Sequence, residues 1–336
     1  MNRASKIWLI VSAALILLGG VLFVAVMAAG DWDFSGLSGG TEDGSIAVSE
    51  GFDSILILGD TEDIRILPAE DGHATVAYKA GEGTTLTATV TDGTLTVSTS
   101  DDLPWYRRFF DFADTEITLY LPRAAYTALT VDISTGDTEI AAGLSFHTLD
   151  IDVSTGDVHL YADADAVSIK GSTADVEVKD AVLGSLRVEV STGDIALSSL
   201  RCRGAVDLTV STGKITLADV DCADLTTVGD TGDLTASDVA VAGTIRVERS
   251  TGDVMLQSLL AIAIEIKTST GDVTFASADA DKITVETSSG DVGGTLCSAK
   301  IFIPRSSSGK IRVPDSTAGG TCRITTSSGD IEITVE

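Results

Sequence analysis

A four-residue motif, Ser-Thr-Gly-Asp or a close variant, recurs through most of this 336-residue chain. Successive copies are only 18–20 residues apart. A fixed period of this length is typical of repeat architectures, in which each repeat is a structural unit that stacks on the next. The third residue of the motif falls at Gly136, Gly156, Ala174, Gly193, Gly213, Gly232, Gly252, Gly271, Gly290, Gly309 and Gly329.

Polar and apolar residues alternate around each motif, as expected for β-strands with one buried face. One example is Leu149-Asp150-Ile151-Asp152-Val153 before a motif and Val158-His159-Leu160 after it. A single strand pair cannot bury its apolar face, but coils stacked about 4.8 Å apart can. The pattern therefore predicts an all-β chain: a right-handed parallel β-solenoid of about eleven coils of 19–20 residues over 129–336.

Three features predict irregularities near the C-terminal end. The apolar position three before the corner glycine, such as Val153, becomes polar from Arg249 onward, which predicts a thinner core there. Pro304 has no backbone N–H, so we expect a bulge or break around it. No polar cap follows the last coil, which we expect to form an open end where Glu332 and Glu336 discourage strand addition.

Residues 46–128 are β-rich but less regular, and they are predicted to cap the N-terminal end of the rod. Residues 55–66 resemble a degenerate coil. Asp92-Gly93 between two alternating segments indicates a β-hairpin.

Residues 7–29 contain no charged residue and are long enough as a helix to cross a hydrocarbon core of about 30 Å. Arg3 and Lys6 precede this segment and Asp31 follows it, so the positive-inside rule places residues 1–6 in the cytoplasm and the remainder outside. The alternative is a signal peptide cleaved near the small residues at 28–30. Residues 30–45 are glycine-rich and are interpreted as a flexible linker.

The balance of charge excludes one class of partner. The chain has 22 Lys and Arg against 50 Asp and Glu, which gives a formal net charge of −28. Binding along nucleic acid needs a basic surface, so we expect no nucleic-acid partner. Cations, basic surfaces and neutral glycans remain as partner classes.

The residue after the corner glycine is aspartate in most coils, so stacking predicts a row of carboxylates. The row is interrupted at Lys214 and Lys310. One interpretation is that each aspartate accepts a backbone N–H in its own turn. The alternative is a cation site, with Ca²⁺ as the candidate ion, because hard cations prefer oxygen ligands. The candidate ligands are Asp233, Asp253, Asp272 and Asp291.

Two cysteines occupy equivalent positions in successive coils. Cys202 and Cys222 each lie nine residues after a corner glycine, so stacking brings them within range of a disulfide, with two buried free thiols as the alternative. Cys297 and Cys322 occupy different coil positions. The three histidines, His73, His147 and His159, also occupy unrelated positions, and they predict neither a catalytic triad nor a metal cluster.

One segment concentrates aromatic and arginine residues that are rare elsewhere in the chain. Such residues are enriched in binding hot spots, so the segment is a candidate contact for a partner or for the bilayer interface. The alternative is that it packs as a plug over the first coil. Its residues are Trp105, Tyr106, Arg107, Arg108, Phe109 and Phe110.

The Ser-Thr-Gly-Asp coils, preceded by Ile117-Thr118-Leu119-Tyr120-Leu121-Pro122, resemble a bacterial cell-surface family of β-solenoid domains of unknown function that is labelled putative adhesin. The similarity covers roughly residues 46–336. It implies a solenoid exposed at the cell envelope, without established catalysis, and some relatives are linked to envelope stress responses. It supplies no catalytic residue to transfer to this chain.

These observations lead to three functional hypotheses. The first is a non-enzymatic module in the bacterial cell membrane, anchored by a single pass, that binds a protein or glycan at the envelope or acts as a scaffold there, with no cofactor. The second is a regulatory or sensory partner of an envelope stress system. The third is a polysaccharide-active enzyme, which would need clustered acids and bases in a walled groove that short coils hardly provide.

Overall fold

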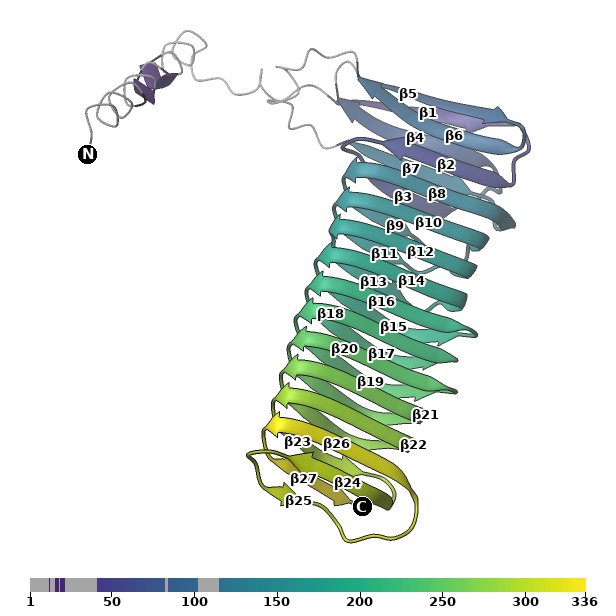
Figure 1. Ribbon diagram of the computed structural model, residues 1–336. Helices are drawn as coiled ribbons and strands as arrows, with labels where there is room; N and C mark the ends of the chain where they lie inside the picture. The colour runs from purple at the N-terminus through teal and green to yellow at the C-terminus, as the bar shows by residue number, and fades with distance from the viewer. Residues whose placement is uncertain (1–11, 13–15, 18, 22–40, 82–83, 102–114) are drawn as a thin grey trace.

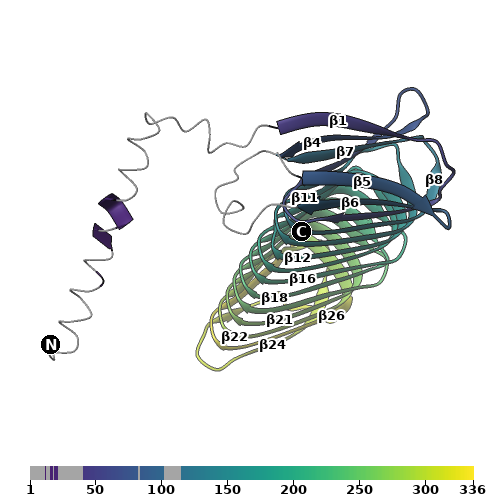
Figure 2. The same ribbon diagram turned by 90° about the horizontal axis from the view of Figure 1, so that it is seen from above.

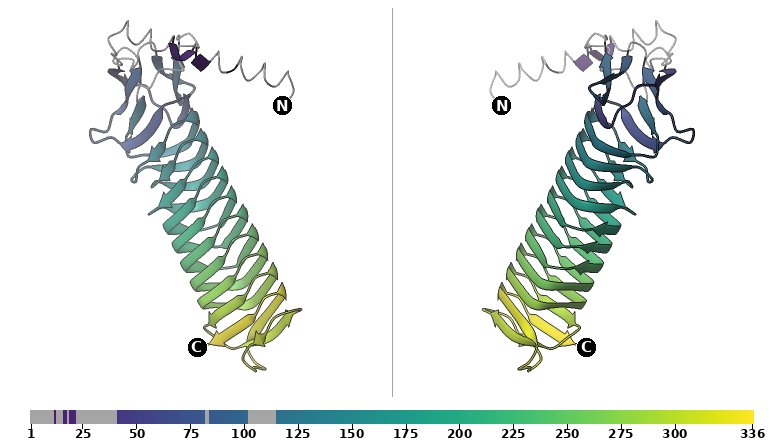
Figure 3. Two further views of the ribbon diagram at one scale, coloured as in Figure 1. Left: turned by 90° about the vertical axis from the view of Figure 1, so that its left-hand side faces the viewer. Right: turned by 90° about the vertical axis from the view of Figure 1, so that its right-hand side faces the viewer.

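The computed structural model describes residues 12, 16, 17, 19–21, 41–81, 84–101 and 115–336. Within these residues, 27 strands form one continuous sheet that winds into a long, straight rod (Figures 1 and 3). Seen from above, the coils lie one behind another along a single axis (Figure 2). The all-β solenoid is confirmed, with about 10 turns.

Each coil consists of a long strand, a tight corner at the glycine, and a second strand. β8 (Ala125–Thr135) is followed by β9 (Thr138–Ile140), and the next coil repeats this with β10 (Ser145–Thr155) and β11 (Val158–Leu160). Neighbouring coils pair in parallel register, so that Leu149 lies between Leu129 and Val167. Equivalent side chains therefore stand in columns, as the period predicts.

The later coils continue this pattern, and in β21 and β22 the second strand of one coil runs on into the first strand of the next. In order they are β12 (Asp163–Thr173), β13 (Val176–Lys179), β14 (Val182–Thr192), β15 (Ile195–Cys202), β16 (Ala205–Thr212), β17 (Ile215–Cys222), β18 (Asp224–Thr231), β19 (Leu234–Val241), β20 (Thr244–Thr251), β21 (Val254–Thr270), β22 (Val273–Ser289), β23 (Val292–Leu296), β24 (Lys300–Ser306), β25 (Ile311–Arg312), β26 (Gly320–Ser328) and β27 (Ile331–Val335).

The inward columns form one narrow aliphatic core along the rod. Ile169 and Val188 are fully buried at one inward position, and Ile195 and Ile215 at another. The polar column at the C-terminal end is also inward, because Thr268 and Thr326 are only 3% and 2% exposed. Polar groups therefore replace aliphatic groups inside the core in these coils.

The corner glycines are required on two grounds. Gly213 has a φ of +151°, and a Cβ there would lie 1.9 Å from the carbonyl oxygen of Gly193 in the coil before. Ala174 is the one non-glycine corner, and Gly171 compensates for it. A Cβ at Gly171, where the two neighbouring coils carry Val153 and Val190, would lie 2.8 Å from the Ala174 Cβ. The missing side chain makes room for the alanine methyl.

A second bend in the coil has a regular position that the sequence analysis did not identify. Six residues after the corner, six successive coils place a non-glycine residue in the left-handed region, with φ between 49° and 56°. Aspartate tolerates this conformation better than most residues. The residues are Asp180, Ser199, Asp219, Asp238, Ser258 and Ser277.

The N-terminal block caps the rod, because further strands pair beside each of the two strands of the first coil. That coil is β2 (Ser54–Gly59) and β3 (Asp63–Pro68), which pair with β8 and β9 and confirm the degenerate coil. Beyond β2 lie β6 (Thr94–Asp101) and β5 (Thr84–Thr91), and beyond β3 lie β7 (Glu116–Leu121), β4 (Ala74–Gly81) and β1 (Thr41–Val48).

The predicted hairpin joins β5 and β6. Asp92 and Gly93 have φ values of 51° and 78°, the positive pair that a two-residue type I′ turn requires. The pairings β4–β7 and β5–β6 are antiparallel, in contrast to the parallel coils. The parallel stack therefore ends at this cap.

The C-terminal end differs from the prediction. β26 pairs with β22 on one side and with β24 on the other, so the last coil of the sequence lies inside the stack. The end of the rod is formed instead by β24 and β25. Pro304 lies in β24, where a strand paired on one side only tolerates the missing N–H. The expectations of an open end at the last coil and of a break at Pro304 were both wrong.

The predicted anchor, residues 7–29, lies mostly outside the described residues. Among the residues that the structure does describe, no helix has the length and apolar character needed to span a membrane. Membrane anchoring therefore stays a prediction from the sequence.

Candidate functional site

The aspartate row is a chain of hydrogen bonds from coil to coil. The Asp253 backbone N–H donates to Asp233 Oδ1 at 2.9 Å, and the Asp272 N–H donates to Asp253 Oδ1 at 2.8 Å. The Asp291 N–H continues the chain to Asp272 Oδ1 at 2.7 Å. Each carboxylate thus satisfies the backbone of the next coil rather than of its own turn, which corrects the sequence-based interpretation.

The order of the row also differs from the chain order. The Asp330 N–H donates to Asp291 Oδ1 at 2.7 Å, and the Lys310 N–H donates to Asp330 Oδ1 at 2.7 Å. Lys310 therefore ends the row and does not interrupt it. Lys214 does interrupt the row. Its backbone N–H donates to Asp194 Oδ1 at 2.7 Å, but its ammonium group cannot accept a hydrogen bond from the backbone of the next coil.

The row remains only a predicted cation site. Its carboxylates already accept backbone hydrogens, which accounts for aspartate at this position without an ion. Within the described part of the chain, no three His, Cys, Asp or Glu side chains are grouped so that they could hold a metal ion. Binding of Ca²⁺ by Asp233, Asp253, Asp272 and Asp291 stays a hypothesis of the sequence analysis.

Cys202 and Cys222 are both buried and both free thiols in the structure. Burial raises the pKa of Cys222 to about 12, with a smaller contribution from Cys202. A Cys202–Cys222 disulfide therefore stays a prediction for the oxidised protein. Cys297 is exposed, and Cys322 is buried in β26.

Each of two histidines has its own carboxylate partner, and the two lie in different coils. His147 Nδ1 is 2.9 Å from Asp165 Oδ2, and Arg203 donates to the other oxygen of Asp165 at 2.8 Å. These hydrogen bonds, that of His147 first, lower the pKa of Asp165. His159 Nδ1 is 3.2 Å from Glu177. His73 is exposed in the cap.

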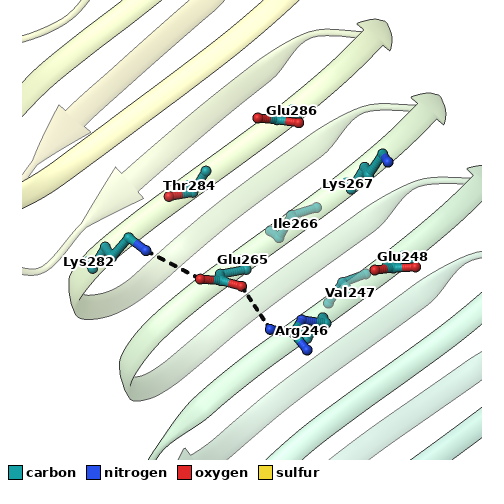
Figure 4. Close-up of a pocket in the computed structure, with 9 residues that line it drawn as sticks. All are labelled: Arg246, Val247, Glu248, Glu265, Ile266, Lys267, Lys282, Thr284 and Glu286. Atoms are coloured by element: carbon teal, nitrogen blue, oxygen red, sulfur yellow. Dashed lines mark hydrogen bonds and ion pairs between the residues drawn. The ribbon is translucent and has the colours of Figure 1, made fainter.

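The outward side of β20, β21 and β22 carries a lattice of alternating charges (Figure 4). Glu265 is its centre, since it accepts hydrogen bonds from Arg246 at 3.2 Å and from Lys282 at 3.3 Å. Both bonds lower the pKa of Glu265. Strand register places Lys267 between Glu248 and Glu286 in the next row.

We call this lattice the C-terminal charged face; it comprises Arg246, Glu248, Glu265, Lys267, Lys282, Thr284 and Glu286. A shallow groove of about 260 Å³ runs over it. It holds three basic and three acidic side chains, so it is locally neutral in a chain of net charge −28. The outward residues of an early coil, Asp150 and Asp152, are by contrast both acidic. A partner of either sign can therefore approach this face.

A second concave site lies in the cap, where three loops meet. This N-terminal cleft has a volume of about 470 Å³ and is lined by residues that include Glu50, Phe52, His73, Pro122 and Tyr126. Tyr126 stacks on Phe52 with 6.0 Å between ring centroids, and its hydroxyl donates to the Pro122 carbonyl at 2.9 Å. Tyr126 therefore supports the wall of the cleft, because its hydroxyl hydrogen is already donated to the Pro122 carbonyl.

The candidate contact segment of Trp105, Tyr106, Arg107, Arg108, Phe109 and Phe110 lies outside the described residues. Its role stays a prediction. The C-terminal charged face was not predicted from the sequence. Aligning the repeats at four, six and eight residues before the corner glycine would have revealed its charges.

The family Toastrack DUF4097 matches residues 52–221 and 214–336. No curated protein matches the chain at a significant level. Among solved structures, a putative adhesin from Parabacteroides distasonis is 14% identical, with 88% of this chain and 97% of that chain covered and a TM-score of 0.42. A putative adhesin from Parabacteroides merdae is 13% identical, with 88% and 96% covered and a TM-score of 0.40.

A putative lipid binding protein from Parabacteroides distasonis is 13% identical, with 88% of this chain and 98% of that chain covered and a TM-score of 0.29. Likenesses at these identities and TM-scores carry no inference about the ligand of this chain.

Proposed function

Because this chain belongs to the Toastrack DUF4097 family, we propose that it is a non-enzymatic, membrane-anchored binding module that displays its rod outside the cytoplasm. Residues 7–29 would provide the anchor and residues 30–40 the linker, because β1 begins at Thr41 and the predicted linker of 30–45 was therefore too long. The partner would be a protein or glycan of the cell envelope. The C-terminal charged face is the observation that carries this proposal.

That face suits recognition because its side chains are held in place before a partner arrives. Arg246 and Lys282 both bond to Glu265, so part of the ordering cost of binding is already met. Its groups repeat at the strand spacing of about 4.8 Å, which fits an extended partner with regularly spaced polar groups. Such contacts give specificity and fast association more than raw affinity.

Site-specific photo-crosslinking on cells that carry the full-length chain tests this proposal. A crosslinker at Lys267, on the charged face, should capture a partner, and one at Thr235, on the outward side of the second strand β19, serves as the matched control. We expect capture from position 267 alone and a decrease as salt rises, because exposed charge contacts are screened. Equal capture from both positions, or none from position 267, would refute binding by this face.

Two further readouts separate the remaining alternatives. Deletion that leaves adhesion intact but changes transcription of envelope-stress genes would support the regulatory hypothesis instead. Release of products from cell-wall polysaccharide by the purified chain would overturn the non-enzymatic part of the proposal.

The anchor is tested separately. We expect the intact chain to stay in the membrane after alkaline carbonate extraction and to keep its N-terminal residues by mass spectrometry. A mature chain that begins near residue 30 would show a cleaved signal peptide instead.

A further inference from the structure

A positively charged side chain lies inside the apolar core of the rod. Arg249 on β20 occupies the inward position three before the corner glycine, where the early coils have Ile133, Val153 and Val190. Its side chain does not reach back to the solvent, because the residue is only 4% exposed. Arginine in such a position needs hydrogen-bond acceptors around all its nitrogens.

The described part of the chain supplies no such acceptor. Nε, Nη1 and Nη2 of Arg249 are all buried, and none of them donates a hydrogen bond to a described residue. Burial lowers the pKa of Arg249, and the charge of Asp233 opposes this effect. A guanidinium nevertheless stays protonated in proteins, so the positive charge in the core persists.

The neighbouring coil is shaped around this guanidinium. Gly229 on β18 pairs with Arg249, and a Cβ at Gly229 would lie 2.0 Å from Nη1. Thr227 lies two residues earlier on the same inward side of β18. Its hydroxyl is fully buried and, within the described residues, also has no partner. Two unpartnered donors, one charged and one neutral, thus face the core from neighbouring coils.

Two coils before Arg249, the aspartate row is interrupted by a basic residue. Lys214 replaces aspartate in the coil next to that of Asp233, and Asp233 is the carboxylate whose charge raises the pKa of Arg249. The negative potential that the row produces elsewhere is therefore reduced here.

We propose that Arg249 and Thr227 hold one small monovalent inorganic anion of the halide class, such as chloride, inside the rod. One negative charge neutralises the guanidinium, and a spherical anion accepts the N–H and O–H donors from several directions. Divalent oxyanions fit less well, because they would leave an excess negative charge beside Asp233. The site does not depend on the proposed binding function.

Crystals of the full-length chain grown in bromide test the location of the anion. We expect an anomalous difference peak within hydrogen-bond distance of the Arg249 guanidinium and the Thr227 hydroxyl. Water density at that position, or nitrogens that all donate to backbone carbonyls, would overturn the proposal.

Thermal unfolding in chloride against gluconate, at constant ionic strength, tests whether the site is occupied in solution. A ligand that binds only the folded state raises the midpoint with its concentration, by about 5 °C when it reaches about 100 times its Kd. Arg249→Met should remove this dependence on chloride. Arg246→Met removes the same charge from the outer face and should leave the dependence intact.

If Arg249→Met does not fold, Thr227→Val provides the second variant, and it should weaken the chloride dependence. An unchanged midpoint in chloride and gluconate for the unmodified protein would overturn the proposal. A bromide peak without chloride-dependent stability would show an adventitious ion only, which also overturns it.

Discussion

Replacement of Gly213 by alanine tests the close stacking of the corners. The new Cβ would lie 1.9 Å from the carbonyl oxygen of Gly193, far inside van der Waals contact, at a φ of +151°. The backbone strain of a non-glycine residue in this region costs about 1–3 kcal/mol. Overpacking against an immovable backbone atom costs about 1–3 kcal/mol more. We expect the free energy of unfolding to fall by about 4 kcal/mol in total.

Thermal unfolding followed by circular dichroism measures this change as a midpoint about 10 °C lower. Stacked repeats unfold locally as well as globally, so hydrogen exchange should show the loss concentrated in β16 and β17. The matched control is Ala174→Gly, at a corner where Gly171 already accommodates a methyl group, and its midpoint should change by only a few degrees. A midpoint for Gly213→Ala within about 2 °C of the unmodified protein would refute the argument from corner stacking.

Three further predictions follow from the C-terminal turns, the cysteines and the charged face. Deletion of residues 320–336 removes the partner of β24, so trypsin should cut the shortened chain rapidly at Arg305, whereas rapid cutting in the intact chain would contradict the observed strand order. Maleimide at pH 8 should label exposed Cys297 well before Cys222, whose pKa burial raises to about 12, and equal rates would show an open core. Hydrogen bonds from two cations lower the pKa of Glu265 in the folded chain. The ionised carboxylate therefore stabilises the fold at pH values above the ordinary glutamate pKa, and this stabilisation is lost as the pH falls through the lowered pKa. In urea titrations at several pH values, the free energy of unfolding of Glu265→Gln should therefore fall less on acidification than that of the unmodified protein. An unchanged pH profile would count against the network.

The parts of the fold that depend on equivalence between repeats could be predicted from the sequence. Alternation around each corner identified the inward residues, such as Ile151 and Val188, because strand residues alternate strictly between two faces. The first coil at 55–66 and the Asp92-Gly93 hairpin were found because each has a local signal.

The candidate sites were less accessible to prediction. The charges of Arg246, Glu265 and Lys282 belong to three different strands and look like isolated surface residues in the sequence. Their meaning depends on register between coils, which cannot be read from one strand. The partnerless state of Arg249 is equally invisible, since it depends on what the surrounding coils fail to offer.

The period by itself determined that the chain stacks into a rod, which residues face its core and where glycine is required at its corners. Only the tertiary structure decided which coil lies next to which, and hence that β26 lies between β22 and β24. The physical reason is that a repeat makes all coils alike, whereas adjacency depends on donors and acceptors at single positions. Pro304 has no N–H to donate to a second neighbouring strand. Lys310 has no carboxylate to accept a backbone N–H from a further coil. The coil that contains these two residues is therefore suited to the end of the rod.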